Sequence, residues 1–283
     1  MNKIFLCSFA SPDLSRSKSR FIKQANQMKI YKNIKIFEFK DLENFKKEQI
    51  KNFLKEGKKR LYGYASWKPH IIKSYLDDIP KNSIIQYSDI GCHFNANGIS
   101  RLIEYIKICK KKNILTFQYK KPKFKAFSKF NYQEYFEYEY TKSDLWRYLN
   151  IKNGSKFLKN QQILSGIIFF KNNQFTRNLL EKWCECSNIN HLIDDSQSKF
   201  KNHPNFKEHR HDQSIFSLLC KKKGVFSLSA SECEWAVFNN KRTWKHLLRF
   251  PIHAKRDKKY NLVKRFIIRQ IKNIKRKVKN AKN

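Results

Sequence analysis

Apolar runs of strand length alternate along this chain with stretches whose apolar residues recur at helical spacing. The strand candidates are Ile4–Phe9, Ile34–Phe39, Ile84–Tyr87, Ile114–Phe117, Ile163–Phe170 and Val225–Leu228. The helix candidates are Ser17–Met28, Asp41–Lys55, His70–Leu76, Ile99–Cys109, Lys142–Leu149, Gln174–Cys186 and Gln213–Cys220. Such alternation is typical of helices packed on a mostly parallel sheet. The sequence therefore predicts an α/β fold. No internal repeat or Gly/Ser linker divides it, so we expect one domain over residues 1–255.

The composition supports a folded chain in a reducing compartment. Of its 283 residues 40% are hydrophobic and 15% aromatic, which is enough to fill a sizeable core and argues against disorder. The seven cysteines form no CxxC pair, and Cys184-Glu185-Cys186 lacks the second half of a zinc site. We expect buried thiols in the cytoplasm. The segment Ile4–Ala10 resembles a weak signal peptide, but we interpret it as the first buried strand.

Charge separates the end of the chain from the rest. The formal net charge is +38, a field that attracts phosphate-bearing partners of any kind, although surface lysines are often only solvated. From Lys255 onward, thirteen Lys and Arg stand against the single acid Asp257. The apolar residues Val263, Ile267, Ile271, Ile274 and Val278 recur at helical spacing. Residues 256–283 are therefore predicted to form a basic amphipathic helix. It either adsorbs to an anionic membrane surface or packs on the domain.

One predicted strand ends in a carboxylate and a glycine. The segment Ile84–Gly91 reads as a short apolar strand followed by Asp89, Ile90 and Gly91. Ligands of open α/β sheets bind at the carboxyl ends of the strands. Asp89 is therefore a candidate site residue, although Asp before Gly is also common in plain turns.

Four further places in the sequence hold residues that suit a binding site. Tyr62–His70 places Tyr64, Trp67 and Lys68 around a glycine, which suits base stacking and phosphate pairing or a plain core plug. Gly166 begins a buried strand and allows close approach to the backbone. The segment Glu208–Ser214 precedes a helix and reads as an N-cap at Asp212, yet it holds more polar groups than a cap requires. His253 offers a neutral imidazole, which is often a metal ligand.

Taken in order, five segments resemble a family of bacterial glycosyltransferases with the GT-A fold. They are Gly63-Tyr64-Ala65-Ser66-Trp67-Lys68-Pro69, Tyr87-Ser88-Asp89-Ile90-Gly91-Cys92, Thr141-Lys142-Ser143-Asp144-Leu145-Trp146, Ser165-Gly166-Ile167-Ile168-Phe169 and His209-Arg210-His211-Asp212-Gln213-Ser214. The resemblance covers about residues 1–255. It implies a GT-A-like mixed, mostly parallel sheet flanked by helices, and transfer of a sugar from a nucleotide-diphosphate donor, such as a UDP-sugar, to a hydroxyl of a cell-surface glycan in lipopolysaccharide or capsule.

The resemblance also implies roles for particular residues. Asp89 matches the second Asp of the family's Asp-x-Asp metal motif, while Tyr87 stands at the first position, and His253 matches a later histidine ligand. A hard cation, Mn²⁺ or Mg²⁺, would clamp the diphosphate. The pair Asp212-Gln213 resembles the Asp-Gln motif of retaining members. The implied catalytic residues are Asp212, Gln213 and Asp144, and the implied donor-binding residues are Tyr64, Trp67, Lys68, Asp89 and Gly166.

Two other classes of function remain open. The high basic charge suits a nucleic-acid-binding protein, but no known nucleic-acid-binding module is present, which disfavours it. The second is a non-catalytic membrane-associated scaffold with the enzyme fold, which the missing first Asp permits. The enzyme reading places the protein in the cytoplasm, peripheral to the inner face of the membrane.

Overall fold

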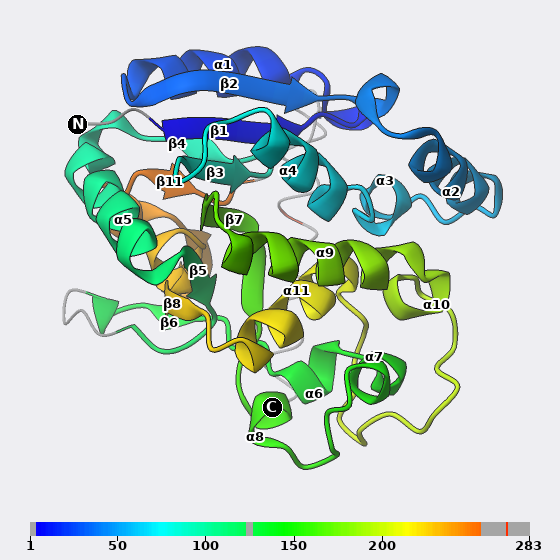
Figure 1. The fold of residues 1–283 in the computed structure, drawn as a ribbon. Coiled ribbons are helices and arrows are strands. Elements are labelled where there is room, and N and C mark those ends of the chain that lie inside the picture. Colours follow the sequence, from blue (N-terminus) through cyan, green and yellow to red (C-terminus); the bar gives the residue numbers. More distant parts are fainter. Residues whose placement is uncertain (1–3, 123–126, 256–269, 271–283) are drawn as a thin grey trace.

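The computed structural model describes residues 4–122 and 127–255, together with residue 270. Strands in this part of the chain form a six-stranded main sheet in the order β2-β1-β3-β7-β5-β8 (Figure 1). They are β1 (Ile4–Phe9), β2 (Tyr31–Phe37), β3 (Ile84–Ser88), β5 (Ile114–Gln118), β7 (Ile163–Lys171) and β8 (Phe226–Ser229). Only β7 runs against its neighbours in this sheet. The predicted α/β class, with a mixed and mostly parallel sheet, is confirmed.

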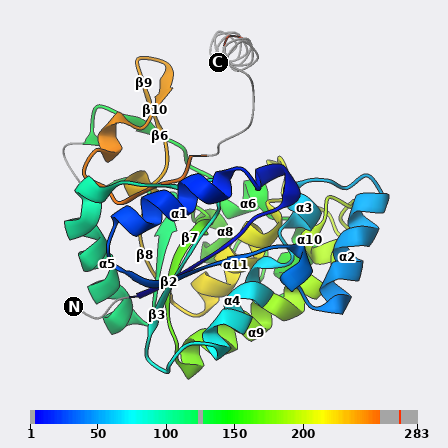
Figure 2. The same cartoon turned by 90° about the horizontal axis from the view of Figure 1, so that it is seen from above.

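Helices cover both faces of the main sheet (Figure 2). The longer ones are α1 (Ser17–Gln27), α2 (Asn44–Lys55), α4 (Lys68–Asp77), α5 (Ile99–Lys112), α9 (Gln174–Asn188) and α11 (His211–Lys222). The shorter ones are α3 (Leu61–Tyr64), α6 (Glu137–Tyr140), α7 (Ser143–Tyr148), α8 (Lys156–Lys159) and α10 (Asn190–Ile193). Each predicted helix overlaps one of these. The bounds differ most at β2, predicted over Ile34–Phe39. As an edge strand it tolerates exposed polar residues, so it begins at Tyr31.

Alternation along the strands divides the apolar side chains into two core layers. In β1, Phe5, Cys7 and Phe9 join the layer that contains α4, α9 and α11. Ile4 and Leu6 of the same strand join the layer that contains α1 and α5. Successive strand residues point to opposite faces, so a buried strand must be apolar on both. This is why the strands were recognisable as continuous apolar runs.

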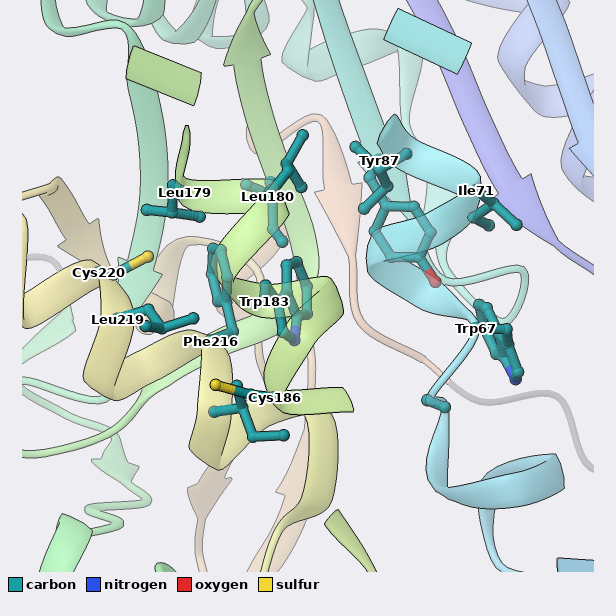
Figure 3. Close-up of a cluster of buried hydrophobic side chains, with 14 of the residues drawn as sticks. Trp67, Ile71, Tyr87, Leu179, Leu180, Trp183, Cys186, Phe216, Leu219 and Cys220 are labelled. Atoms are coloured by element: carbon teal, nitrogen blue, oxygen red, sulfur yellow. The ribbon is translucent and has the colours of Figure 1, made fainter. Parts of the chain in front are cut away.

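The first layer packs α9 and α11 against each other and against the sheet. Trp183 of α9 and Phe216 of α11 are both fully buried, with ring centroids 4.5 Å apart (Figure 3). Tyr87 of β3 lies on the same side, near Ile71 of α4 (Figure 3). This packing fixes the first turns of α4 and α11 beside the strand ends of the sheet.

Short strands outside the main sheet were not predicted, because two or three residues give no measurable periodicity. β6 (Asn131–Tyr132), β9 (Ala236–Phe238) and β10 (Lys241–Thr243) form a small sheet that stands away from the main one (Figure 2). β4 (His93–Phe94) pairs with β11 (Ile252–His253). The latter pair brings the chain near residue 253 back to the segment that follows β3.

Three further expectations concern the chain as a whole. All seven cysteines are buried and free, as predicted. Among the described residues, no helix has both the length and the apolar character that a membrane span needs. The predicted basic helix over residues 256–283 lies outside the described residues, apart from residue 270.

Candidate functional site

A cavity of about 810 Å³ opens where several strands of the main sheet end. Ser11 follows β1, Asp89 follows β3 and Glu234 follows β8, and all three line the cavity. β7 runs the other way, so its first half, including Leu164, Ser165 and Gly166, meets the same edge. The cavity therefore occupies the carboxyl edge of the parallel strands, where α/β folds bind ligands. Its volume lies within the range of about 300–1,000 Å³ that is usual for small-molecule sites.

A buried ion cluster forms the wall of this cavity. The side chain of Lys68 is 4% exposed, and its ammonium lies 2.6 Å from Asp212 Oδ2 and 3.3 Å from Asp89 Oδ1. It also donates to the backbone carbonyl and the hydroxyl of Ser165, each at 3.3 Å. The Ser165 hydroxyl in turn donates to Asp212 Oδ2 at 2.7 Å. One cation is thus shared by two carboxylates from different parts of the sequence.

The carboxylates keep Lys68 charged. Burial by itself would lower the pKa of the ammonium, but the charges of Asp212 and Asp89 outweigh burial and raise the pKa above its usual value. The hydroxyl of Tyr87 donates to Asp89 Oδ1 at 2.7 Å. Tyr87 therefore holds Asp89 in position.

Two helices begin at the cavity. Trp67 and Lys68 stand at the start of α4, and His211, Asp212 and Gln213 form the first turn of α11. The N-terminus of a helix carries a partial positive charge and free N–H groups, so it favours anions. The sequence left open whether Asp212 is the N-cap of α11 or a site residue. In the structure Arg210 occupies the cap position, and the Asp212 carboxylate lies 2.6 Å from the Lys68 ammonium.

A left-handed turn borders the cavity next to α4. The five consecutive residues Leu61–Ala65 all have positive φ, between 49° and 81°. Left-handed backbone costs non-glycine residues about 1–2 kcal/mol each, so such a run needs support from its surroundings. The amide of Tyr64 donates to the carbonyl of Arg60 at 2.8 Å, closing one turn. Leu61, Tyr62 and Ala65 line the cavity, so this strained segment shapes the site.

An aromatic wall lies beside the ion cluster. Trp67 stacks on Phe9 with ring centroids 3.9 Å apart and an angle of 21° between the planes. The Tyr62 ring lies 6.3 Å from that of Phe9, and all three residues line the cavity. A flat aromatic surface close to a cation suits a ligand that combines an aromatic base with phosphates.

Most of the residues predicted to form the site lie together. Trp67, Lys68, Asp89, Gly166, Asp212 and Gln213 all line the cavity. Gly166 was expected to permit close approach of a ligand to the backbone. In the structure the approaching group is the carboxylate of Asp89, whose Oδ2 would lie 2.9 Å from a Cβ at that position. Gln213 donates from Nε2 to Gln162 Oε1 at 2.8 Å, which orients its amide.

Tyr64, Asp144 and His253 do not line the cavity. Tyr64 is 2% exposed, and its ring packs 4.6 Å from the ring of His211, which does line it. Asp144 is buried in α7, where its Oδ1 accepts from the amide of Lys199 at 3.1 Å. His253 Nε2 lies 2.9 Å from the carbonyl oxygen of Leu247. The structure therefore does not bring these three side chains to the ion cluster.

Near Asp89 the protein offers a metal ion one carboxylate ligand and not a complete set of ligands. No group of three or more His, Cys, Asp and Glu suited to a metal occurs within residues 4–122 and 127–255. Asp89 is 46% exposed at its side chain and can offer a carboxylate oxygen. Mg²⁺ is commonly held by one or two carboxylates together with substrate phosphates. Asp89 would thus hold a cation only jointly with a bound diphosphate.

Several cavity residues were not singled out from the sequence. They are Arg60, Glu234, Trp235 and Arg242. Glu234 follows a predicted strand, as Asp89 does. A 3-10 turn at Ala230–Glu232 separates it from β8, so the strand-end signal is weaker. Arg242 reaches the cavity from the hairpin of β9 and β10. These strands are too short for a pattern in the sequence to predict them.

The chain was compared with protein families, with curated protein sequences and with solved structures, and only solved structures match it. No protein-family model matches the chain, and no curated protein sequence matches it. Among solved structures, it is similar to a glycosyltransferase involved in the glycosylation of the major capsid of PBCV-1. That similarity has 10% identity and a TM-score of 0.46, over 94% of this chain and 99% of the other. The chain is also similar to mouse xyloside xylosyltransferase 1 in its apo form, with 10% identity and a TM-score of 0.40, over 82% of this chain and 87% of that one.

Proposed function

We propose that the protein is a glycosyltransferase that moves a sugar from a nucleotide-diphosphate donor, such as a UDP-sugar, to a hydroxyl of a glycan. The observation that carries this proposal is the cluster of Lys68, Asp89 and Asp212 in the wall of a ligand-sized cavity. The cluster sets one cation against two carboxylates, so its net negative charge suits a divalent cation bound together with the diphosphate, and its carboxylate oxygens can accept from sugar hydroxyls.

The charges that line the cavity support a small mixed-charge ligand. Its basic residues are Lys59, Arg60, Lys68, Arg210, Arg242 and Lys255, and its acidic residues are Asp13, Asp89, Glu208, Asp212 and Glu234. The signs nearly balance, although the whole chain carries +38. A nucleic-acid backbone favours a uniformly basic groove. A nucleotide sugar needs both kinds of charge, because basic side chains bind its diphosphate and carboxylates accept from its sugar hydroxyls.

The chemistry assigns a side of the cavity to each part of the donor. The aromatic wall of Phe9 and Trp67 would receive the base, and Lys68 with the N-terminus of α4 would meet the diphosphate. Asp212 and Gln213 would face the sugar, where a carboxylate stabilises the oxocarbenium-like transition state. Mn²⁺ or Mg²⁺, if held by Asp89 and the donor, would add charge neutralisation on the diphosphate. By its likeness to the retaining Asp-Gln motif, this pair favours retention.

Donor hydrolysis tests the proposal directly. Purified protein is incubated with a panel of nucleotide sugars, with and without Mn²⁺, and released nucleotide is measured. We expect slow hydrolysis of one donor and at least a hundredfold loss in Asp89→Asn and Asp212→Asn. Asp78→Asn is the matched control, because Asp78 is 52% exposed and pairs with Lys35 on the outside of the fold. A chain that neither hydrolyses nor binds any donor would not be a transferase.

The acceptor and the location form a separate part of the proposal. The basic pattern over residues 256–283 favours contact with an anionic membrane surface, and with it assembly of a surface glycan such as lipopolysaccharide or capsule. Vesicles with 30% anionic lipid should sediment the full chain and not a chain ending at Lys255. Equal sedimentation of both chains would remove the membrane part and leave the transferase assignment intact.

A further inference from the structure

Glu234 is held in the cavity wall by a rigid backbone. Its amide donates to the carbonyl of Ala230 at 2.7 Å, and the amide of Ala254 donates to the carbonyl of Cys233 at the same distance. These bonds tie the segment after β8 to the chain that follows β11. The Glu234 side chain lines the cavity that also contains the ion cluster. A carboxyl group thus stands in the same cavity as Lys68 and Asp212.

The carboxyl group of Glu234 has weak hydrogen-bond partners compared with the other cavity acids. Its Oε2 accepts from the amide of Trp235 at 3.3 Å, and its Oε1 lies 3.5 Å from the hydroxyl of Tyr119. Asp89 and Asp212 share Lys68, and Glu208 lies 2.9 Å from Arg60. The lone pairs of Glu234 are therefore more available to a ligand.

The surroundings of Glu234 hold its protonation near balance. Burial raises its pKa to about 7, against the opposing charges of Arg242 on β10 and Arg210 before α11. The other titratable groups that its charge acts on are the Tyr119 hydroxyl and the thiols of Cys92 and Cys233, and the His246 ring nitrogen lies 3.0 Å from its backbone carbonyl oxygen. A group that exchanges protons in catalysis works best with a pKa near the working pH.

The residues next to Glu234 suit a sugar ring. Trp235 and Arg242 line the cavity with it. The Arg242 guanidinium lies 4.3 Å from the Trp235 ring and 4.6 Å from the Trp244 ring, so the hairpin of β9 and β10 holds a cation between two indoles. An aromatic face beside charged groups can pack against ring C–H groups while the charges bind hydroxyls.

We infer that Glu234, Trp235 and Arg242 form the acceptor side of the cavity, and that Glu234 removes the proton from the attacking hydroxyl. The inference rests on the proposed function. In this step the acceptor O–H bond breaks and its proton moves to the Glu234 carboxylate. The acceptor oxygen bonds to the anomeric carbon, and the bond from that carbon to the diphosphate breaks with its electron pair on the leaving oxygen. The step is a single displacement, which inverts the anomeric carbon when the acceptor attacks opposite the diphosphate and retains its configuration when the acceptor attacks from the same face.

The test compares donor binding with transfer. UDP affinity is measured on the full chain. Transfer is measured with the donor that the chain hydrolyses and with water or the methyl glycosides of galactose, glucose and xylose as acceptors. In Glu234→Gln the affinity for UDP should stay within threefold of wild type, while the rate of sugar transfer should fall by a factor of about 10²–10⁴. The wild-type rate should rise with pH up to about 7 and then level off, and this rise should vanish in Glu234→Gln. Glu48→Gln is the control, because Glu48 pairs with Lys51 on the surface of α2.

The outcomes separate this inference from the proposed function. If Glu234→Gln melts more than 5 °C below wild type, Glu234→Asp replaces it. We then expect unchanged UDP affinity and a smaller loss of rate that keeps its rise with pH, because the carboxylate is retained but withdrawn by one methylene. A variant that keeps the wild-type rate and pH profile overturns the acceptor role while the transferase assignment stands. A wild-type protein that binds no UDP and hydrolyses no donor overturns both.

Discussion

Lys68 shows how one buried residue can hold a site together. Its ammonium is 4% exposed and lies near two carboxylates that come from separate segments of the chain. Removing one partner of a buried ion pair leaves charge that is neither hydrated nor paired. The stability of the fold and the geometry of the site therefore depend on the same contact.

Asp212→Asn should lower the free energy of unfolding by about 3 kcal/mol, because Lys68 then retains only Asp89, at the longer distance of 3.3 Å. Asn can still accept from the Ser165 hydroxyl, so packing should change little. Urea denaturation at pH 7 measures the loss. Asp77→Asn, whose surface pair with Arg177 is half exposed, should cost less than about 1 kcal/mol. A loss equal to that of this control would contradict the paired-charge interpretation.

At the scale of elements, the left-handed turn at Leu61–Ala65 connects α2 to α4. Gly63 has φ +81°, and a Cβ there would lie 3.0 Å from Ile50 Cγ1 in α2. Gly57 has φ +77° with open space around it. The two glycines therefore share a left-handed backbone, which would strain any other residue, and differ in packing.

Gly63→Ala should destabilise the protein more than Gly57→Ala. Strain alone should cost about 1 kcal/mol at Gly57, and the contact with Ile50 should bring the loss at Gly63 to about 2 kcal/mol or more. Parallel urea denaturation curves measure both. Equal losses would mean that α2 moves aside without cost. Because the turn lines the cavity, Gly63→Ala should also weaken donor binding.

A partly buried polar contact joins three helices. Lys46 of α2 and His70 of α4 both approach Asn188 Oδ1 at the end of α9, at 2.7 Å and 3.0 Å. Burial lowers the pKa of Lys46 to about 7, from 10.5 for a free side chain. Between these values the unfolded chain binds more protons than the folded one, so this group makes stability rise with pH.

The rise should be measurable between pH 7 and 8.5. Over this interval Lys46 should add about 1–2 kcal/mol to the free energy of unfolding. Each pH unit is worth about 1.4 kcal/mol when Lys46 is protonated in the unfolded chain and neutral in the folded one. Lys46→Met should remove that part of the pH dependence. Lys51→Met, at a position 49% exposed on the same helix, should keep it. Identical pH dependence in wild type and Lys46→Met would show that Lys46 titrates normally.

At the scale of the whole molecule, the net charge of +38 opposes compaction, because like charges are brought closer together on folding. The surface ion pairs offset only part of this repulsion. Stability should therefore depend on ionic strength independently of any ligand.

Raising NaCl from 20 to 300 mM should increase the melting temperature by several degrees, with most of the gain below 150 mM, where the Debye length falls to about 8 Å. Differential scanning fluorimetry measures the change, and sucrose at matched osmolality is the non-screening control. A melting temperature that stays constant or falls with salt would show that self-repulsion does not limit stability.

The sequence by itself determined the order and class of the main elements. β1, β3, β5 and β7 were predicted within one residue at each end, because strands buried on both faces must be continuous apolar runs. It also indicated most of one site wall. Asp89, Lys68 and Asp212 stand at strand ends and helix starts, where α/β folds bind their ligands.

Only the tertiary structure decided which of these groups meet. Lys68 and Asp212 are separated by 144 positions, and nothing local predicts a contact of 2.6 Å between them. Likewise, no periodicity marks the short hairpin that brings Arg242 to the cavity. Nor does any local pattern predict that Tyr64 packs in the core beside His211. Local patterns report whether a residue lies in a strand, a helix or a turn. Contacts between side chains far apart in the sequence depend on how the sheet orders its strands, and that order emerges only when the whole core packs.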